Sequence, residues 1–282
     1  MRKVFLILLV LFSLLAIFLV VQLNKRTSEE ESTGYQSIEI GRGKSPSIGQ
    51  YVKLNLLVRN AAKDTLHFIE EFPYFLIIHE DELSSALCER SVGDSGVYML
   101  KRSVLEDFYA FEKRINVPKD SIIYLYFRLM EVIPPNQLKV FQKEALFDRK
   151  IKQERVLDEY LKKMKGKIDT LEGEVYRIIE RRNPEGIEIR KGSKVHLDHI
   201  GRFFSGYEFI NTLERGISPF FYYGKEFELL EAVEVGLEGI KSGEKLKIIL
   251  PSQNAFGEEG SVAGVVPPNT AIIYEIDIIN VE

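Results

Sequence analysis

Residues 227–250 read FELLEAVEVGLEGIKSGEKLKIIL and place a short helix, a turn and an apolar strand in direct succession. From Phe227 to Val235 the apolar residues recur at helix-like spacing, and we expect the helix to end at Gly236, which adopts a left-handed cap easily. Gly243-Glu244 is typical of a turn, and the run from Lys247 to Leu250 has strand character. The pattern predicts a short helix beside a sheet.

The segments on either side of this stretch alternate as strands do. Val195, Leu197 and His199 are expected on one face of a strand, and the residues between them on the other, because the side-chain period of a strand is two. Residues 271–281 alternate in the same way. Both segments therefore predict strands of one sheet.

An earlier part of the chain repeats this organisation. Four pairs of short segments recur in the same order at separations of about 141 to 150 residues. They are Val52-Lys53-Leu54-Asn55 with Lys194-Val195-His196-Leu197, Pro73-Tyr74-Phe75 with Pro219-Phe220-Phe221, Gly93-Asp94 with Gly243-Glu244, and Val117-Pro118 with Val266-Pro267. Four pairings in one order predict an internal duplication.

The N-terminus carries a long apolar run. Every residue from Val4 to Val21 except Ser13 is apolar, which is long enough to cross about 30 Å of hydrocarbon. The run has no Ala-x-Ala-like cleavage site, so it predicts an uncleaved transmembrane anchor over residues 1–26 that meets the membrane through residues 4–23; a cleaved signal is the alternative. Because only three residues precede the run, we expect the rest of the chain outside the cytoplasm, in a periplasm-like space or at the cell surface.

Residues 136–167, between the two copies, predict a helical linker. Their apolar residues recur at helix spacing, and they hold ten Lys plus Arg against five Asp plus Glu. We expect a solvated amphipathic connector; a surface that touches acidic headgroups or a partner is the alternative. The recurring apolar positions are Leu138, Phe141, Ala145, Ile151, Leu157, Leu161 and Met164.

Charge and composition exclude several classes of function. The chain has 38 Lys plus Arg against 42 Asp plus Glu, a net charge of −4, so we expect no nucleic-acid partner. The single cysteine, Cys88, cannot form an intramolecular disulfide, and only four histidines are present. Two of them, His196 and His199, fall on opposite faces of the predicted strand, so we expect no metal site there.

Residues 174–282 resemble the FKBP-type peptidyl-prolyl isomerases. The resemblance is carried by an ordered set over some ninety residues: Gly192, Gly201, Gly206-Tyr207-Glu208-Phe209, Pro219-Phe220, Gly224, Gly236-Leu237-Glu238-Gly239-Ile240-Lys241-Ser242-Gly243-Glu244, Leu250-Pro251-Ser252, Ala255-Phe256-Gly257 and Val265-Val266-Pro267-Pro268-Asn269-Thr270. The first copy keeps a similar opening at Gly41-Arg42-Gly43 and a similar closing strand, but it has nothing like Ala255-Phe256-Gly257. It resembles an FKBP domain that has lost its pocket.

This resemblance implies an α+β fold, in which a curved antiparallel sheet wraps around one short helix. The predicted organisation is a transmembrane anchor at 1–26, a degenerate FKBP-like domain at 34–133, a helical linker at 136–167 and an FKBP-type isomerase domain at 174–282.

The chemistry of such a domain needs no nucleophile, metal or acid–base pair, so we expect no cofactor. Rotation about an X–Pro amide breaks its conjugation, and the uncatalysed step takes about tens to hundreds of seconds. A twisted amide is less polar across its C–O bond than a planar one. A dry aromatic cradle that grips proline and removes water from the amide therefore favours the transition state.

By position, the resemblance implies a pocket made of ten residues of the second copy. Those expected to act in catalysis are His199, Phe209, Phe220, Leu230, Phe256 and Tyr274, and those expected to bind substrate are Ile210, Val233, Val265 and Val266. Several depart from the family. His199 replaces a tyrosine, Ile210 an aspartate, Val233 an aromatic floor, Phe256 a tyrosine and Tyr274 a phenylalanine. The aromatic residues could equally be core residues of a small β domain.

Two hypotheses follow for the chain. The first is a membrane-anchored, outward-facing isomerase that acts on proline-containing polypeptides and assists the folding of envelope proteins. The alternative is a catalytically inactive FKBP-like module that binds proteins or acts as a chaperone. The altered pocket at His199, Ile210 and Val233 is what separates them.

Overall fold

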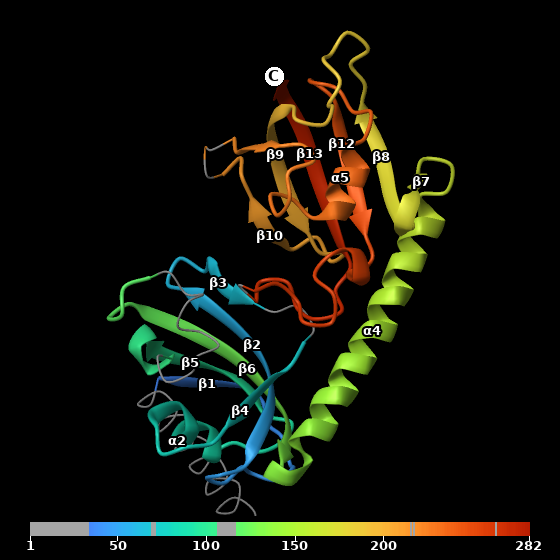
Figure 1. Cartoon of the computed structure of the whole chain (residues 1–282). Helices are drawn as coiled ribbons and strands as arrows, with labels where there is room; N and C mark the ends of the chain where they lie inside the picture. Colours follow the sequence, from blue (N-terminus) through green and yellow to red (C-terminus); the bar gives the residue numbers. More distant parts are fainter. Residues whose placement is uncertain (1–33, 69–71, 106–116, 215, 217, 263) are drawn as a thin grey trace, which may run out of the picture. The chain divides into compact units, whose positions relative to one another are not determined.

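The computed structural model describes residues 34–68, 72–105, 117–214, 216, 218–262 and 264–282. The chain divides into two compact units, the second of which holds Phe72 and residues 139–282. Within the described residues, each unit has an antiparallel sheet and one short α-helix, and the second unit also has one long helix (Figure 1). The elements of the first unit are β1 (Tyr35–Glu39), β2 (Tyr51–Asn60), β3 (Thr65–Phe68), β4 (Tyr74–Ile77), α2 (Glu82–Cys88), β5 (Ser95–Lys101), η1 (Arg102–Leu105), β6 (Ile122–Ile133) and η2 (Pro135–Gln137).

The second unit has the same kinds of elements and a long helix before them. They are α4 (Leu138–Lys163), β7 (Asp169–Leu171), η3 (Glu172–Glu174), β8 (Val175–Arg181), β9 (Lys194–Arg202), β10 (Glu208–Asn211), β11 (Phe220–Tyr222), α5 (Glu231–Leu237), β12 (Lys245–Leu250), η4 (Ser252–Asn254) and β13 (Ile272–Val281).

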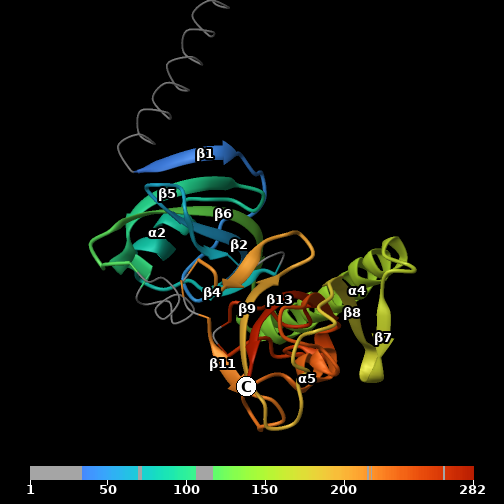
Figure 2. The same cartoon turned by 90° about the horizontal axis from the view of Figure 1, so that it is seen from above.

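The two sheets share one topology. The first has the strand order β1-β5-β6-β2-β3, with β4 also paired to β2, and Figure 2 shows β1, β5, β6 and β2 following one another across it. The second has the order β8-β12-β13-β9-β10, with β11 paired to β9 and β7 added beside β8. Because α2 and α5 also occupy the same place in the order, the structure supports an internal duplication.

The strand register corrects two of the sequence pairings by one residue. Val52 pairs with Leu76 on β4, and Val195 pairs with Phe221 on β11, so Val52 corresponds to Val195 and Leu76 to Phe221. Val52 and Val195 are both completely buried. The comparison of the two copies in the sequence aligned Val52 with Lys194. That alignment would make a buried position equivalent to a solvent-facing one.

The short helix of the second unit begins and ends later than the sequence predicted. It covers Glu231–Leu237, and the glycine with a left-handed backbone is Gly239, at φ +69°. Gly236 lies inside the helix. A Cβ there would come within 2.4 Å of Cδ1 of Ile248. Glycine is therefore needed at 236 for close packing of the helix on the sheet and not for a cap.

Helix α4 packs on the second unit, whereas the sequence predicted a solvated connector. Its buried residues are Ala145, Arg149 and Gln153, spaced four apart on one face. The Arg149 Nε donates to the carbonyl oxygen of Pro268 at 2.9 Å. The backbone N–H of Ala271 donates to the Gln153 side chain at 3.2 Å. The buried face is thus partly polar, which a search for apolar periodicity does not find.

The expectation of a fold that includes a transmembrane anchor is corrected. Within the residues that the structure describes, no helix is both long and apolar enough to cross a membrane. The longest helix there, α4, has 26 residues but carries many charges. The predicted anchor at residues 1–26, with its membrane contact through residues 4–23, lies outside the described residues.

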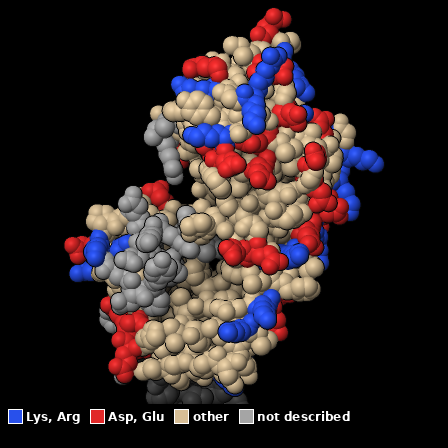
Figure 3. All heavy atoms as spheres, viewed as in Figure 1, with Lys and Arg blue, Asp and Glu red and all other residues tan. Residues whose placement is uncertain are grey.

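Charges of both signs are mixed on the molecular surface. On the face shown in Figure 3, Lys and Arg lie among Asp and Glu over the second unit. Several of these charges form ion pairs, among them Lys247 with Glu180 and Glu275, each at 3.0 Å.

Candidate functional site

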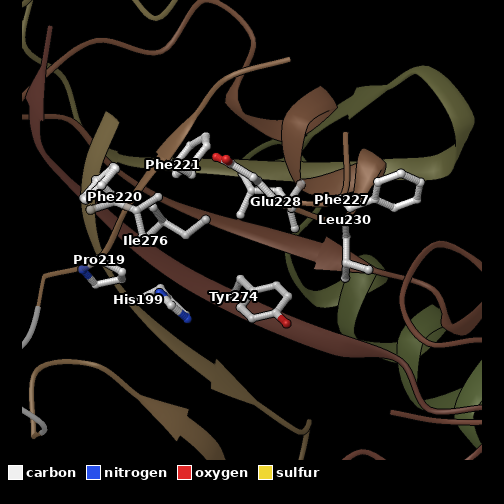
Figure 4. A pocket seen from close by; sticks show the side chains of 12 residues that line it. His199, Pro219, Phe220, Phe221, Phe227, Glu228, Leu230, Tyr274 and Ile276 are labelled. Atoms are coloured by element: carbon white, nitrogen blue, oxygen red, sulfur yellow. The ribbon is translucent and has the colours of Figure 1, made fainter. Parts of the chain in front are cut away.

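The second unit contains an apolar hollow of about 580 Å³ between its sheet and its short helix, a volume in the usual range for ligand sites. Its walls come from β9, β13, β11 and the segment that leads into α5. Figure 4 shows the rings of His199 and Tyr274 next to each other, with Phe220 and Phe227 at opposite ends of the set. The lining residues are Leu197, His199, Pro219, Phe220, Phe221, Phe227, Glu228, Leu229, Leu230, Val233, Tyr274 and Ile276.

Strand periodicity positions one wall of the hollow. On β9, Leu197 and His199 point to the same side, as the sequence predicted, and β13 places Ile276 opposite His199. Tyr274, two residues earlier on β13, lies opposite Gly201. Together these side chains make a floor of aliphatic and aromatic groups, with Leu230 and Val233 of the α5 region facing it.

Ring contacts fix the orientation of Tyr274. Its ring meets His199 edge-on at a centroid distance of 6.0 Å and Phe209 at 5.9 Å. Phe209 also packs on Phe203 at 5.1 Å. A Cβ at Gly201 would lie 2.5 Å from the Phe209 ring, so glycine at 201 is what allows this ring to lie over the strand. Aromatic contacts of this kind favour one ring orientation.

The hollow contains few polar groups. Glu228 accepts hydrogen bonds from Lys225 and from the backbone N–H of Tyr222, and the Lys225 bond is the main reason that the pKa of Glu228 is lowered. Burial raises the pKa of Tyr274 to about 12, so its hydroxyl stays protonated at neutral pH. Within the described part of the chain, no group of three or more His, Cys, Asp or Glu side chains could hold a metal ion.

Five of the ten predicted site residues line the hollow: His199, Phe220, Leu230, Val233 and Tyr274. The other five lie elsewhere. Phe209 supports Tyr274 from outside the hollow, and Ile210 lies opposite Gly201 on β10. Phe256 is half-buried against the core, Val266 is fully buried, and Val265 is 38% exposed.

Phe220 and Phe221 lie on opposite faces of β11, although only Phe220 was predicted at the site. Phe221 is 6% exposed and belongs to the core cluster of the unit, whereas Phe220 is 53% exposed. The Phe220 ring lies 5.5 Å from His196 and 4.8 Å from Nζ of Lys194, on the face of the sheet away from the core.

Sequence reasoning missed seven lining residues. They are Leu197, Pro219, Phe221, Phe227, Glu228, Leu229 and Ile276. The period of two could have found Leu197 and Ile276, because they share a face with His199 and Tyr274. A strand of three residues such as β11 has no period to read, so Phe221 carried no signal of its own.

The corresponding positions of the first unit carry buried aliphatic side chains. The strand registers put Leu56 where the second unit has His199, Val58 where it has Gly201, and Leu125 where it has Tyr274. All three are buried, at 4% exposure or less. Aliphatic side chains therefore stand in the first unit where the second unit has His199, Gly201 and Tyr274.

Comparison with known proteins places the second unit in a known family. Residues 185–279 match the family model of the FKBP-type peptidyl-prolyl cis-trans isomerases. The chain is 28% identical over 96 residues to the isomerase FKBP2 of Mus musculus, a match that covers 34% of this chain and 67% of the mouse protein. It is 31% identical over 97 residues to the isomerase FPR2 of Saccharomyces cerevisiae, covering 34% of this chain and 70% of the yeast protein.

Solved structures similar to the chain include FkpA from Escherichia coli, with a TM-score of 0.44 and 21% identity over 52% of this chain and 70% of that one. The N-terminal domain of FKBP42 from Arabidopsis thaliana has a TM-score of 0.38 and 25% identity over 41% of this chain and 91% of that one. The family model matches residues 185–279, which include the lining of the hollow, and the yeast relative is matched over 70% of its own length. By that match, the chain belongs to the FKBP-type peptidyl-prolyl cis-trans isomerase family.

Proposed function

We propose that the second unit catalyses cis–trans isomerisation of X–Pro bonds in polypeptide substrates and so assists their folding. The observation that carries the proposal is the hollow itself, which is apolar, half enclosed and large enough for a proline ring with its neighbours. Leu230 and Val233 face Ile276 and Tyr274 across it. The first unit, which has Leu56 and Leu125 in place of His199 and Tyr274, has a structural or binding role.

The hollow supplies what the reaction needs. Its apolar walls remove water from the amide, and a planar amide loses more from that removal than a twisted one, because the planar form is the more polar. No side chain has to form a bond or move a proton. The function therefore depends on the shape and dryness of the walls.

A matched pair of variants of the full chain tests this function. Leu230→Arg places a charge in the hollow, whereas Ile187→Arg places the same charge at a position that is 60% exposed and outside it. We expect the unaltered chain and Ile187→Arg to accelerate isomerisation of a proline-containing tetrapeptide. We expect the rate with Leu230→Arg to be lower by at least about 10-fold, because an unpaired charge in apolar surroundings is strongly disfavoured. A rate equal to that of buffer for the unaltered chain would overturn the proposal.

A second candidate function is binding of proline-rich or unfolded segments without catalysis. The apolar rim favours it, because Phe227 is 99% exposed and Phe220 is 53% exposed beside the hollow. In that case the same peptide binds the unaltered chain but not Leu230→Arg, and no rate is accelerated. The two functions thus differ in the isomerisation rate and not in the binding of peptide.

We also propose that the substrates are envelope proteins met outside the cytoplasm. Its support is the apolar run of residues 4–21 behind a short basic start, which is typical of an export signal. A reporter fused after Glu282 should be active only outside the cytoplasm. Activity of the reporter in the cytoplasm alone would contradict this location.

A further inference from the structure

The hollow holds one hydroxyl whose hydrogen-bonding capacity is unused. Most of its lining is hydrocarbon, and the Glu228 carboxylate is already held by Lys225 and by the Tyr222 backbone. The Tyr274 hydroxyl, in contrast, has no hydrogen-bond partner among the residues that the structure describes. Its ring is held in place by Phe209 and His199. The site therefore offers an oriented O–H donor in apolar surroundings.

A proline-containing peptide brings the complementary group. Proline has no backbone N–H, so a peptide around an X–Pro bond carries more carbonyl acceptors than amide donors. When such a peptide fills the hollow, water leaves both its carbonyls and the tyrosine hydroxyl. A donor or acceptor left without a partner there would weaken binding.

We propose that the Tyr274 hydroxyl donates a hydrogen bond to a backbone carbonyl oxygen of the bound proline-containing peptide, and that this bond sets the affinity of the site. The proposal rests on the proposed binding of such peptides. The accepting carbonyl belongs to a peptide unit that does not rotate. A bond to the rotating amide would stabilise its planar, more polar form and oppose the reaction.

The role is therefore one of substrate positioning, with a distinct kinetic signature. A bond made equally in the ground state and the transition state lowers KM and leaves kcat unchanged. The strength expected of one neutral hydrogen bond corresponds to a change in affinity of about 3- to 10-fold.

The test is Tyr274→Phe in the full chain, which removes only the hydroxyl. We expect Kd for the proline tetrapeptide and KM to rise together by about 3- to 10-fold, while kcat and the midpoint of urea unfolding stay unchanged. Tyr176→Phe is the matched control, because Tyr176 is a half-buried tyrosine of the same sheet outside the hollow. An unchanged Kd, or a fall in kcat at constant KM, would overturn the proposal.

A change on the peptide side gives an independent measurement. In a series of peptides, each has a different backbone carbonyl replaced by a methylene group. We expect one of them to bind the unaltered chain more weakly than the unmodified peptide does. The same replacement should leave binding to Tyr274→Phe unchanged. If every replacement weakens both proteins equally, the hydroxyl makes no bond to the peptide. An unaltered chain that neither binds nor isomerises the peptide refutes the proposed function as well, whereas an active chain insensitive to Tyr274→Phe refutes this inference alone.

Discussion

Asp94 and Glu244 hold equivalent turns in the two units, and each carboxylate accepts hydrogen bonds from two backbone amides. Asp94 accepts from Gly41 and Ser91, and Glu244 accepts from Asn183 and Lys241. Both carboxylates are buried, at 8% and 2% exposure. The glycine before each carboxylate, Gly93 or Gly243, has a left-handed backbone. Its N–H donates to a carbonyl oxygen of the final strand of its own unit, Leu129 of β6 or Ile278 of β13.

These two turns give the first prediction. Asp94→Asn and Glu244→Gln each exchange one accepting oxygen for an NH₂ group, which cannot accept from a backbone N–H. We expect each substitution to lower the free energy of unfolding of its own unit by about 1–3 kcal/mol, the cost of a buried polar group left unpaired. Urea unfolding followed by hydrogen exchange assigns the loss to one unit. Asp64→Asn, at an exposed turn, is the control; equal midpoints for all three would contradict this account.

The sequence revealed the repeat because such turns keep a residue pattern even when the strands around them change. Gly93-Asp94 and Gly243-Glu244 were recognisable because a left-handed glycine followed by a buried acid restricts both positions. Strand pairs gave a weaker signal, and two of them were matched one residue out of register. A one-residue shift moves every side chain of a strand to the other face, so these two matches were wrong in face as well as in register.

The site was harder to predict than the fold. Periodicity correctly placed Leu197 and His199 on one face, but it says nothing about which rings enter a hollow from short strands and loops. Phe256 and Val266 do not line the hollow; they lie in the loop after η4, where Ser261 and Val266 are hydrogen-bonded to each other. Such loop bonds depend on tertiary contacts that local sequence does not specify.

The second prediction separates the neighbouring rings of β11. Phe221→Ala should lower the free energy of unfolding by about 3–5 kcal/mol, because the ring is buried in the core. Phe220→Ala should lower it by less than about 1 kcal/mol, because its ring lies exposed near Lys194. Urea unfolding of both variants measures the difference. A larger loss for Phe220→Ala would show that the assignment of the two faces is wrong.

The third prediction concerns Gly201. A methyl group there would collide with the ring of Phe209, so Gly201→Ala should push the ring away and remove the support of Tyr274. We expect a loss of stability of about 1–3 kcal/mol and weaker binding of the proline peptide. Calorimetric titration with the peptide measures the affinity. Ile200→Ala, on the opposite face of the same strand, should keep it; unchanged affinity in Gly201→Ala would contradict the support by Phe209.

The fourth prediction concerns the docking of α4. Arg149→Met keeps the length of the side chain but removes its bonds to the Pro268 carbonyl and to the Thr270 hydroxyl at 2.8 Å. Because Thr270 is buried and Pro268 is half-buried, we expect a loss of about 1–3 kcal/mol in the stability of the second unit. Lys150→Met, the exposed neighbour on α4, is the control for the loss of one charge. Equal unfolding midpoints for the two variants would show that α4 does not stabilise this unit.

The last prediction follows from the burial that raises the pKa of Tyr274 to about 12. An unfolded tyrosine has a pKa of about 10, so the unfolded state releases this proton at lower pH than the folded state does. The stabilising effect of the neutral hydroxyl is therefore complete below pH 10 and is lost as the pH rises towards 12. We expect the free energy of unfolding to fall less steeply in Tyr274→Phe than in the unaltered chain between these two pH values. Urea titrations across this range measure both slopes. Parallel slopes would mean that the Tyr274 hydroxyl is as well solvated in the folded chain as in the unfolded one, and the apolar character of the hollow would then be in error as well.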